Sequence, residues 1–434
     1  MTTVVASPPR VVGGFGAALI SVNSMIGAGI FALPALLYAQ AGNFAPWMFL
    51  IFGLCYICTV LVVARLTTMF DASGGPQLYA QAAFGPLVGF LVGWLLVIGA
   101  ASARAATMYV LVSYLAILFP ALDRPLARQV SVLLLIAALS GLTLSGMRNA
   151  IGGMVVGTVI KLTPILVLCL VAFAQGGIAV SFKPPSLDSF GSVTLLVYFA
   201  FSGAANPAAT AGEIKDPHRT LPRSMLLSLA GIMLFYMIVQ WAYIAAGAPG
   251  SGGDATPLAA AAGALFGEIG VIALTIAAIF SIATNALAYF VSGPRIIYGM
   301  ADRGLLPPAF AHISPRFLTP DAAILLFTVI VAGFSFSGTF ASLATVMSLA
   351  AQIVGVSTFA AFVAFRLRKH NGHPDGLSLF WVLVVVVGVS FAIYACTQAP
   401  REAYAMVAGL IVVGGVLSLV AMRDKVKQPE PQYD

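Results

Sequence analysis

The chain has 434 residues, of which 60% are hydrophobic and 8% are charged, and its formal net charge is +7. Soluble domains carry about 25% charged residues, so this composition indicates a protein dissolved in lipid and excludes soluble enzymes and nucleic-acid-binding proteins. Apolar runs of roughly 20 residues, long enough to cross a ~30 Å hydrocarbon core, recur along the whole sequence.

These apolar runs, separated by polar breaks, predict an all-α membrane protein with about twelve transmembrane helices. A short polar start, 1–12, precedes the first run without the small-residue cleavage site of a secretory signal, so we expect the first span to be retained. A polar tail, 423–434, follows the last span. The predicted spans are 13–37, 44–70, 85–119, 126–146, 151–175, 190–212, 222–248, 264–300, 321–336, 339–365, 378–396 and 403–422.

The basic residues indicate how these spans are oriented. With both termini on one side, that side collects most of the 21 lysines and arginines. Such a bias is typical of cytoplasmic loops, so we expect both termini in the cytoplasm and a multi-pass protein of the inner or plasma membrane. The positive charge therefore requires no nucleic-acid partner. Basic residues on the opposite side are Arg124, Arg128, Lys183 and Arg401.

The cysteines and histidines do not predict a metal or redox site. Cys55 and Cys58 lie one helical turn apart inside a span, and Cys169 and Cys396 lie in other apolar runs. Ordinary buried cysteines are favoured over a redox or metal pair, and no disulfide framework is implied. A solvated basic loop is favoured over metal or anionic-lipid binding for the histidines, which all fall in predicted cytoplasmic loops. They are His218, His312, His370 and His373.

Two spans carry signals for interrupted helices. The first has Gly27 and Gly29 in mid-span, and the sixth has Gly203 followed by Asn206-Pro207. Proline removes a backbone donor and disfavours helix at the preceding residue, and an interrupted helix is tolerated in lipid only where it lines a cavity or is buried in protein. The two spans lie five helices apart, as expected for corresponding helices of two inverted repeats that meet at the bilayer midplane. The repeats would comprise 13–175 and 190–365, with 378–422 outside them.

Such a pair of breaks suits a zwitterionic cargo. Amides freed at the start of a half-helix attract a carboxylate, and freed carbonyls accept hydrogen bonds from an ammonium group. An α-amino acid presents both groups on one carbon. The alternative is that the glycines only allow close helix packing; it is favoured for one such motif alone but not for the matched pair.

Three segments resemble motifs of the amino acid–polyamine–organocation superfamily of permeases. Residues 24–31, SMIGAGIF, are similar to its helix 1 motif G-[SA]-G-I-F. The loop 212–222, GEIKDPHRTLP, resembles E-E-x-K-[ND]-P-x-R-x-[IL]-P, with glycine in place of the first glutamate. Residues 293–307, GPRIIYGMADRGLLP, are similar to G-x-R-x-x-Y-A-M-A-R-D-G-x-L-P. The resemblance lies across most of the first ten helices and implies a LeuT-type fold of 5+5 inverted repeats, alternating access and an amino-acid-like substrate.

The resemblance also implies substrate contacts in both broken helices. The glycine stretch of the first would bind the substrate carboxylate, and carbonyls near the two breaks would bind its amino group. Ala204 and Ala205 stand where the family often has an aromatic gate and an acidic residue, which implies a roomier pocket or different gate and no acidic partner for a cationic substrate. The contact residues so implied are Ile26, Gly27, Ala28, Gly29, Phe199, Ala200, Phe201, Ser202, Gly203 and Ala204.

Lys161 is one of two charged residues that lie near the middle of a predicted span, and such charges are functional candidates. It resembles the helix 5 lysine of proton-coupled members of the superfamily, whose ammonium is thought to take the place of a sodium ion. Burial disfavours the charged form of a lysine, so this group can exchange a proton near neutral pH. Helix 1 carbonyls and the hydroxyls of Ser281 and Thr284 could stabilise the charged form. The alternative is a permanently charged lysine that ties helix 5 to helix 1.

Arg104 is the other charged residue near the middle of a predicted span. It could pair with an acidic substrate side chain or repel cationic ones, or it could satisfy carbonyls of the broken segments or lie in a wet vestibule, and the sequence leaves these open. In either case, an arginine in a site without a carboxylate argues against polyamines and for neutral or acidic substrates.

The sequence therefore predicts a secondary active transporter that imports a neutral or acidic amino acid with a proton, Lys161 being the coupling switch. The main alternative is an amino-acid exchanger of the same fold in which this lysine is structural. A channel, a solute sensor and a membrane-embedded enzyme are less favoured, because a continuous polar pore lining, an appended signalling domain and an intramembrane acid–base cluster are not recognisable. No ATP-binding P-loop, metal or other cofactor is predicted.

Overall fold

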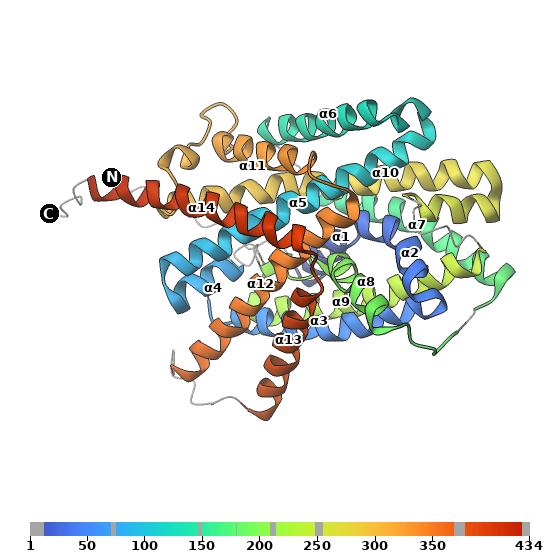
Figure 1. Cartoon of the computed structure of the whole chain (residues 1–434), viewed down its shortest axis with the longest axis horizontal. Coiled ribbons are helices and arrows are strands. Elements are labelled where there is room, and N and C mark those ends of the chain that lie inside the picture. The colour runs from blue at the N-terminus through green and yellow to red at the C-terminus, as the bar shows by residue number, and fades with distance from the viewer. Residues whose placement is uncertain are drawn as a thin grey trace.

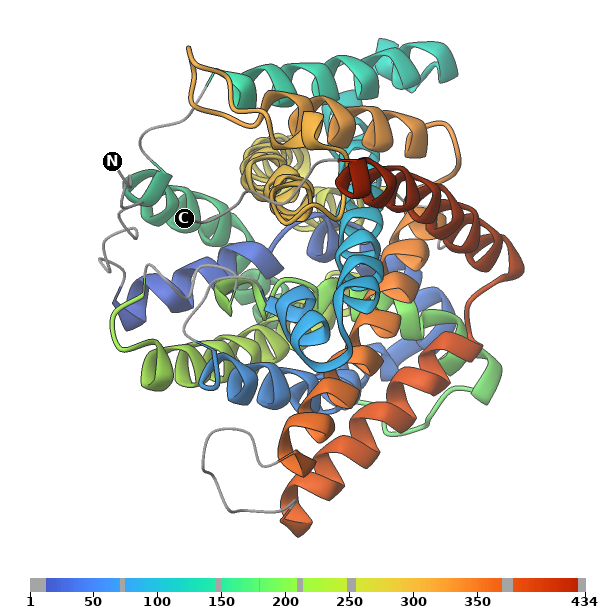
Figure 2. The same cartoon turned by 90° about the vertical axis from the view of Figure 1, so that its left-hand side faces the viewer.

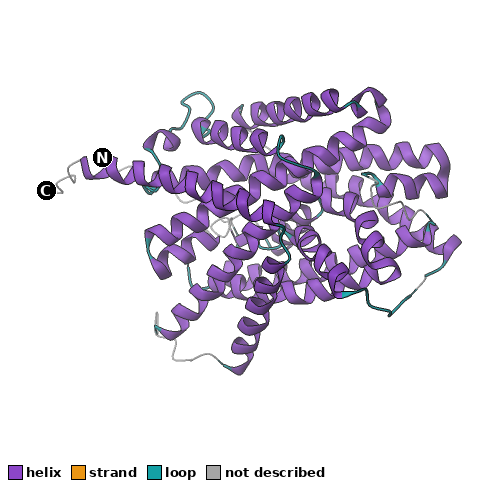
Figure 3. Cartoon of the chain, in the orientation of Figure 1, coloured by secondary structure: helices purple, strands orange, loops and turns teal. Residues whose placement is uncertain are grey.

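The computed structural model describes residues 13–70, 75–145, 150–178, 180–208, 214–247, 255–368 and 378–427. The regular structure of these residues is helical (Figure 3). The predicted tail 1–12 and the pair His370 and His373 lie outside the described residues. The helices are α1 (Gly14–Met25), α2 (Ala28–Ala41), α3 (Ala45–Thr67), α4 (Gly75–Phe84), α5 (Pro86–Leu118), α6 (Pro125–Leu144), α7 (Ala150–Gly176), α8 (Leu187–Phe201), α9 (Pro217–Ala245), α10 (Pro257–Asp302), α11 (Asp321–Phe334), α12 (Phe340–Leu367), α13 (Leu379–Thr397) and α14 (Arg401–Lys427).

The helices have the length and composition of a multi-pass membrane protein. Within the described residues, eight helical stretches are long and apolar enough to cross a bilayer. Four shorter apolar helices accompany them, among them α1, α8 and α11. The all-helical membrane class that the sequence predicts is therefore confirmed.

Several predicted spans are divided differently in the structure. The first span is broken between α1 and α2, as expected from its glycines. The sixth, predicted as 190–212, is helical only to Phe201; a turn and a short 3-10 segment at 206–208 follow, and 209–213 lie outside the described residues. The eighth, predicted from 264, lies in α10, where a non-helical Gly267 with a φ of 65° separates a first helical segment, from Pro257, from the long segment that follows close to the predicted start. The last continues through Lys427, beyond its predicted end at 422.

The arrangement of the helices places the two breaks in the middle of the molecule. The long helices α5 and α10 pack against each other, and α1, α2 and α8 meet beside them (Figure 1). The pair α6 and α11 forms one edge, and the pair α12 and α13 forms the opposite edge (Figures 1 and 2). The helix α4, which the sequence analysis did not predict, packs on α5 and α12.

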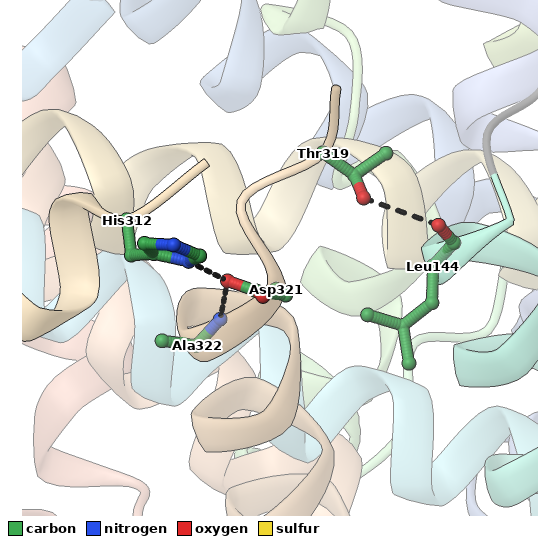
Figure 4. Close-up of polar contacts among 5 residues, drawn as sticks. All are labelled: Leu144, His312, Thr319, Asp321 and Ala322. Carbon is green, nitrogen blue, oxygen red and sulfur yellow. Dashed lines mark hydrogen bonds and ion pairs between the residues drawn. The ribbon is translucent and has the colours of Figure 1, made fainter. Parts of the chain in front are cut away.

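The loop between α10 and α11 is held by side-chain hydrogen bonds (Figure 4). The Nδ1 atom of His312 lies 2.7 Å from Oδ1 of Asp321, which also accepts a 2.8 Å bond from the amide of Ala322. Thr319 donates a 3.1 Å hydrogen bond to the carbonyl of Leu144 at the end of α6. These contacts fix the start of α11 against the end of α6.

Candidate functional site

The break in the first span exposes backbone groups to side chains of other helices. Two residues, Ile26 and Gly27, separate α1 from α2, and the amide of Gly27 donates a 2.9 Å bond back to Met25. A Cβ atom at Gly27 would lie 2.7 Å from Oδ1 of Asn285, so the close approach of α10 requires glycine here. No side chain caps the start of α2. Its first amides therefore lack helical partners and form a site of positive potential.

The break after α8 meets the first one directly. Gly203 has a φ of 105°, and a Cβ atom there would lie 2.7 Å from the Tyr289 hydroxyl and 2.8 Å from the Ser24 carbonyl. The hydroxyl of Ser21 donates a 3.2 Å bond to the carbonyl of Ala204. A Cβ atom at Gly29 would lie 3.4 Å from the backbone of Ala200.

The structure thus brings the two predicted contact segments, 26–29 and 199–204, together. All of their residues are buried except Ser202 and Gly203, which are half-buried. The Ser202 hydroxyl donates to the carbonyl of Phe199 at 2.7 Å and so caps the end of α8 locally.

Lys161 lies against the first break, on α7. Its side chain is 2% exposed, and Nζ donates to Oδ1 of Asn23 at 2.7 Å and to the carbonyl of Ile26 at 3.4 Å. The expected contact with helix 1 carbonyls is therefore present.

Ser281 and Thr284, the other predicted partners of this lysine, make different contacts. The Thr284 hydroxyl donates to carbonyls of its own helix, those of Phe280 and Ser281, at 2.8 and 3.1 Å. The buried Ser281 hydroxyl has no hydrogen-bond partner among the described residues.

Arg104 approaches the same breaks from α5. It is 5% exposed, its Nη1 donates to Oδ1 of Asn285 at 3.0 Å, and its guanidinium carbon lies 3.9 Å above the centre of the Tyr289 ring. The Tyr289 hydroxyl accepts a 2.7 Å bond from Asn206 and donates a 3.3 Å bond to the Ser24 carbonyl. A cation–π contact of this kind is favourable, more so away from water.

A family model for amino acid permeases matches residues 12–420. The chain belongs to the amino acid permease family. This confirms the resemblance found in the sequence motifs.

Relatives of this permease include transporters of known and unknown cargo. It is 30% identical to the serine/threonine exchanger SteT of Bacillus subtilis over 70% of this chain and 71% of the relative. It is 27% identical to a transporter of Mycobacterium tuberculosis over 95% of this chain and 92% of the relative. It is 26% identical to the arginine/agmatine antiporter of Chlamydia caviae over 84% of this chain and 79% of the relative.

Asn285 links Arg104 and Lys161, the two buried cations of the described residues. The Nδ2 atom of Asn285 donates to the Asn23 carbonyl at 2.7 Å, while Oδ1 accepts from Arg104. Asn23 in turn accepts from Lys161 through its side chain. A chain of hydrogen bonds therefore runs from α7 through α1 and α10 to α5.

Sequence reasoning missed the roles of Asn23, Asn285 and Tyr289. The available signal was an amide side chain in each of two apolar helices, since buried amides require hydrogen-bond partners. Which backbone groups they would reach depends on how the helices are rotated about their axes, and the sequence alone does not give that rotation.

Proposed function

We propose that the permease is a secondary active transporter that imports a neutral or acidic amino acid together with a proton. The proposal includes the LeuT-type scaffold of about twelve spans in 5+5 inverted repeats, both termini in the cytoplasm, and a bacterial cell membrane as its location. The observation that carries it is the hydrogen bond of 2.7 Å from buried Lys161 to Asn23, beside the first helix break.

The two breaks provide complementary groups for the backbone of an amino acid. The uncapped start of α2, at Ala28 and Gly29, supplies amides for the carboxylate, while the Gly27 amide donates to the carbonyl of Met25. Carbonyls of Ile26 and of the segment from Phe199 to Ser202 would accept hydrogen bonds from the ammonium group. A zwitterion is thereby held without a charged side chain.

Lys161 is suited to couple a proton to the movement of helix 1. Its protonated form holds Asn23 and the Ile26 carbonyl, both on the broken helix. Loss of the proton removes the charge and weakens both hydrogen bonds, since charge-assisted bonds are roughly twice as strong as neutral ones. The broken helix is then released from α7, which permits the change from one open side to the other.

A second candidate function is amino-acid exchange on the same scaffold. Two of the relatives named above are an exchanger and an antiporter. In that case Lys161 stays protonated throughout the cycle and acts only as a structural tie between α7 and α1.

Uptake into proteoliposomes distinguishes the two. Vesicles empty of amino acid are given a radiolabelled amino-acid panel with and without an inward proton gradient. A symporter accumulates its substrate when the gradient is present, and Lys161→Ala reduces that accumulation at least about tenfold, because one charge-assisted hydrogen bond is worth more than 1.4 kcal/mol.

The matched control is Lys183→Ala, which removes an exposed lysine and should leave uptake unchanged. Uptake that requires preloading with amino acid, and that ignores the proton gradient, would contradict symport and favour exchange.

A further inference from the structure

The centre of the permease holds positive charge that no buried aspartate or glutamate of the described residues balances. Arg104 and Lys161 are the charged side chains among the buried residues that the structure describes, and no described aspartate or glutamate is buried. Both cations bind neutral groups instead, the amides of Asn285 and Asn23 and the carbonyl of Ile26. A buried charge is costly unless it is paired, so an anion at this place would be strongly stabilised.

One edge of the Arg104 guanidinium has a donor that no described residue accepts from. A guanidinium has five N–H donors in a planar fork. The bond to Asn285 uses Nη1. Nε is buried and has no hydrogen-bond partner in the described part of the chain. An unpartnered charged donor of this kind matches a carboxylate, which binds the guanidinium edge with two parallel hydrogen bonds.

The place of this edge relates it to the site for the amino-acid backbone. The Asn285 oxygen that accepts from Arg104 is the atom that a Cβ at Gly27 would touch. The Tyr289 ring beneath the guanidinium carries the hydroxyl that lies beside Gly203. Arg104 is therefore adjacent to both breaks, on the side of α5 and α10.

We propose that the cargo is an amino acid with a second carboxylate, and that its side-chain carboxylate binds the Nε edge of Arg104. This inference rests on the proposed function. The segment after α8 is compatible with it, because Gly203, Ala204 and Ala205 are small and uncharged and do not compete for the guanidinium.

The proposal fixes the charge that crosses the membrane in each cycle. A dicarboxylic amino acid has a net charge of −1 at neutral pH, and the proton carried on Lys161 adds +1. Their joint import is electroneutral, whereas import of a neutral amino acid with a proton moves one positive charge inward. The two substrate classes therefore differ in their response to membrane potential.

The test uses the full-length protein in proteoliposomes with potassium and valinomycin to set the potential. We expect L-glutamate or L-aspartate to compete at least about tenfold better than L-glutamine or L-asparagine, since a charge-assisted bidentate pair is at stake. Accumulation should follow the proton gradient and be indifferent to an inside-negative potential.

Two variants locate the effect. Arg104→Gln should reduce the preference for the acid over its amide to near one, and Arg104→Lys should retain part of it. The control Arg128→Gln removes a half-buried arginine that is paired with exposed Asp123, away from both breaks, and should leave the preference intact. The competition assay on the unmodified protein stands by itself if Arg104→Gln does not fold.

The outcomes separate this inference from the function on which it rests. Proton-driven accumulation of neutral amino acids that increases with an inside-negative potential would overturn the dicarboxylate assignment and leave proton symport standing. Absence of uptake for every amino acid tested would overturn both.

Discussion

The two sides of the broken first helix are held by different chemistry. On the α9 side, three neutral side chains donate to its carbonyls: Ser228 to Ala18 at 3.2 Å, Tyr236 to Met25 at 2.7 Å and Gln240 to Pro34 at 3.0 Å. These bonds reach both α1 and α2, so α9 holds the two halves of the broken helix together. On the other side, α7 and α10 hold the same helix through a network that includes two cations.

The difference indicates which contacts can change during transport. Hydrogen bonds between neutral groups do not depend on protonation at physiological pH, whereas in the proposed proton symport those of Lys161 do. We therefore expect α1, α2 and α9 to move as one body, and the contacts to α5, α7 and α10 to form and break. Substitutions on the two sides test this expectation.

Gly203→Ala should have the largest effect, because it disturbs the contact of the second break with Tyr289 on α10. The new Cβ would be strained by the positive φ of 105° and would lie 2.7 Å from the Tyr289 hydroxyl. Strain and overpacking together should cost about 3 kcal/mol of stability and abolish most transport. Thermal inactivation in detergent, followed by size-exclusion chromatography, measures the first effect and proteoliposome uptake the second.

Its control is Gly141→Ala on α6, where a Cβ meets nothing within 4 Å. This variant should behave like the unmodified protein. Equal behaviour of Gly203→Ala and Gly141→Ala would show that the contact between the two breaks is not required.

Asn285→Ala should break the chain of hydrogen bonds that links Arg104 to Lys161. It removes the acceptor of Arg104 and the donor to the Asn23 carbonyl, and buried partners left unsatisfied cost about 2 kcal/mol. The link between α10 and α1 is one of the contacts expected to form and break during transport. The proton dependence of uptake should therefore weaken along with stability. An unchanged response of uptake to external pH would contradict the expectation that this contact forms and breaks during transport.

Tyr236→Phe should have the smallest effect of these substitutions, and it should lower stability without changing transport properties. It removes one neutral hydrogen bond to the Met25 carbonyl, worth about 1 kcal/mol. The midpoint of thermal inactivation should fall by a few degrees, while the proton dependence and substrate preference of uptake stay as they are. A shift in proton dependence as large as that of Asn285→Ala would mean that the two sides do not differ in the way proposed.

The sequence predicted the features that depend on single residues with strong local preferences. Gly27 and Gly29 in an apolar run indicated the first break, and Gly203 with Asn206-Pro207 indicated the second. The exact end of α8 was not predictable, because small and apolar residues continue past Phe201, where the helix ends, and the positive φ of Gly203 follows only two residues later.

Polar contacts between helices were harder to predict. Lys161 could be placed near helix 1 from the family resemblance, but its partner Asn23 could not. Ser281 and Thr284 were reasonable alternatives on the neighbouring helix. In the structure the Thr284 hydroxyl bonds to its own backbone, a local preference of serine and threonine in helices that competes with tertiary contacts.

The Tyr289 hydroxyl has a consequence for the order of events in the transport cycle. It is bonded to Ser24, at the end of α1, and to Asn206, in the short 3-10 segment that follows the turn after α8, so a single oxygen atom is shared by the two broken segments. If one segment leaves α10, that hydroxyl loses a partner and its hold on the other segment weakens. Cooperative hydrogen bonds of this kind favour loss of both together. The two broken helices are therefore expected to leave α10 simultaneously, which would make a half-released intermediate short-lived.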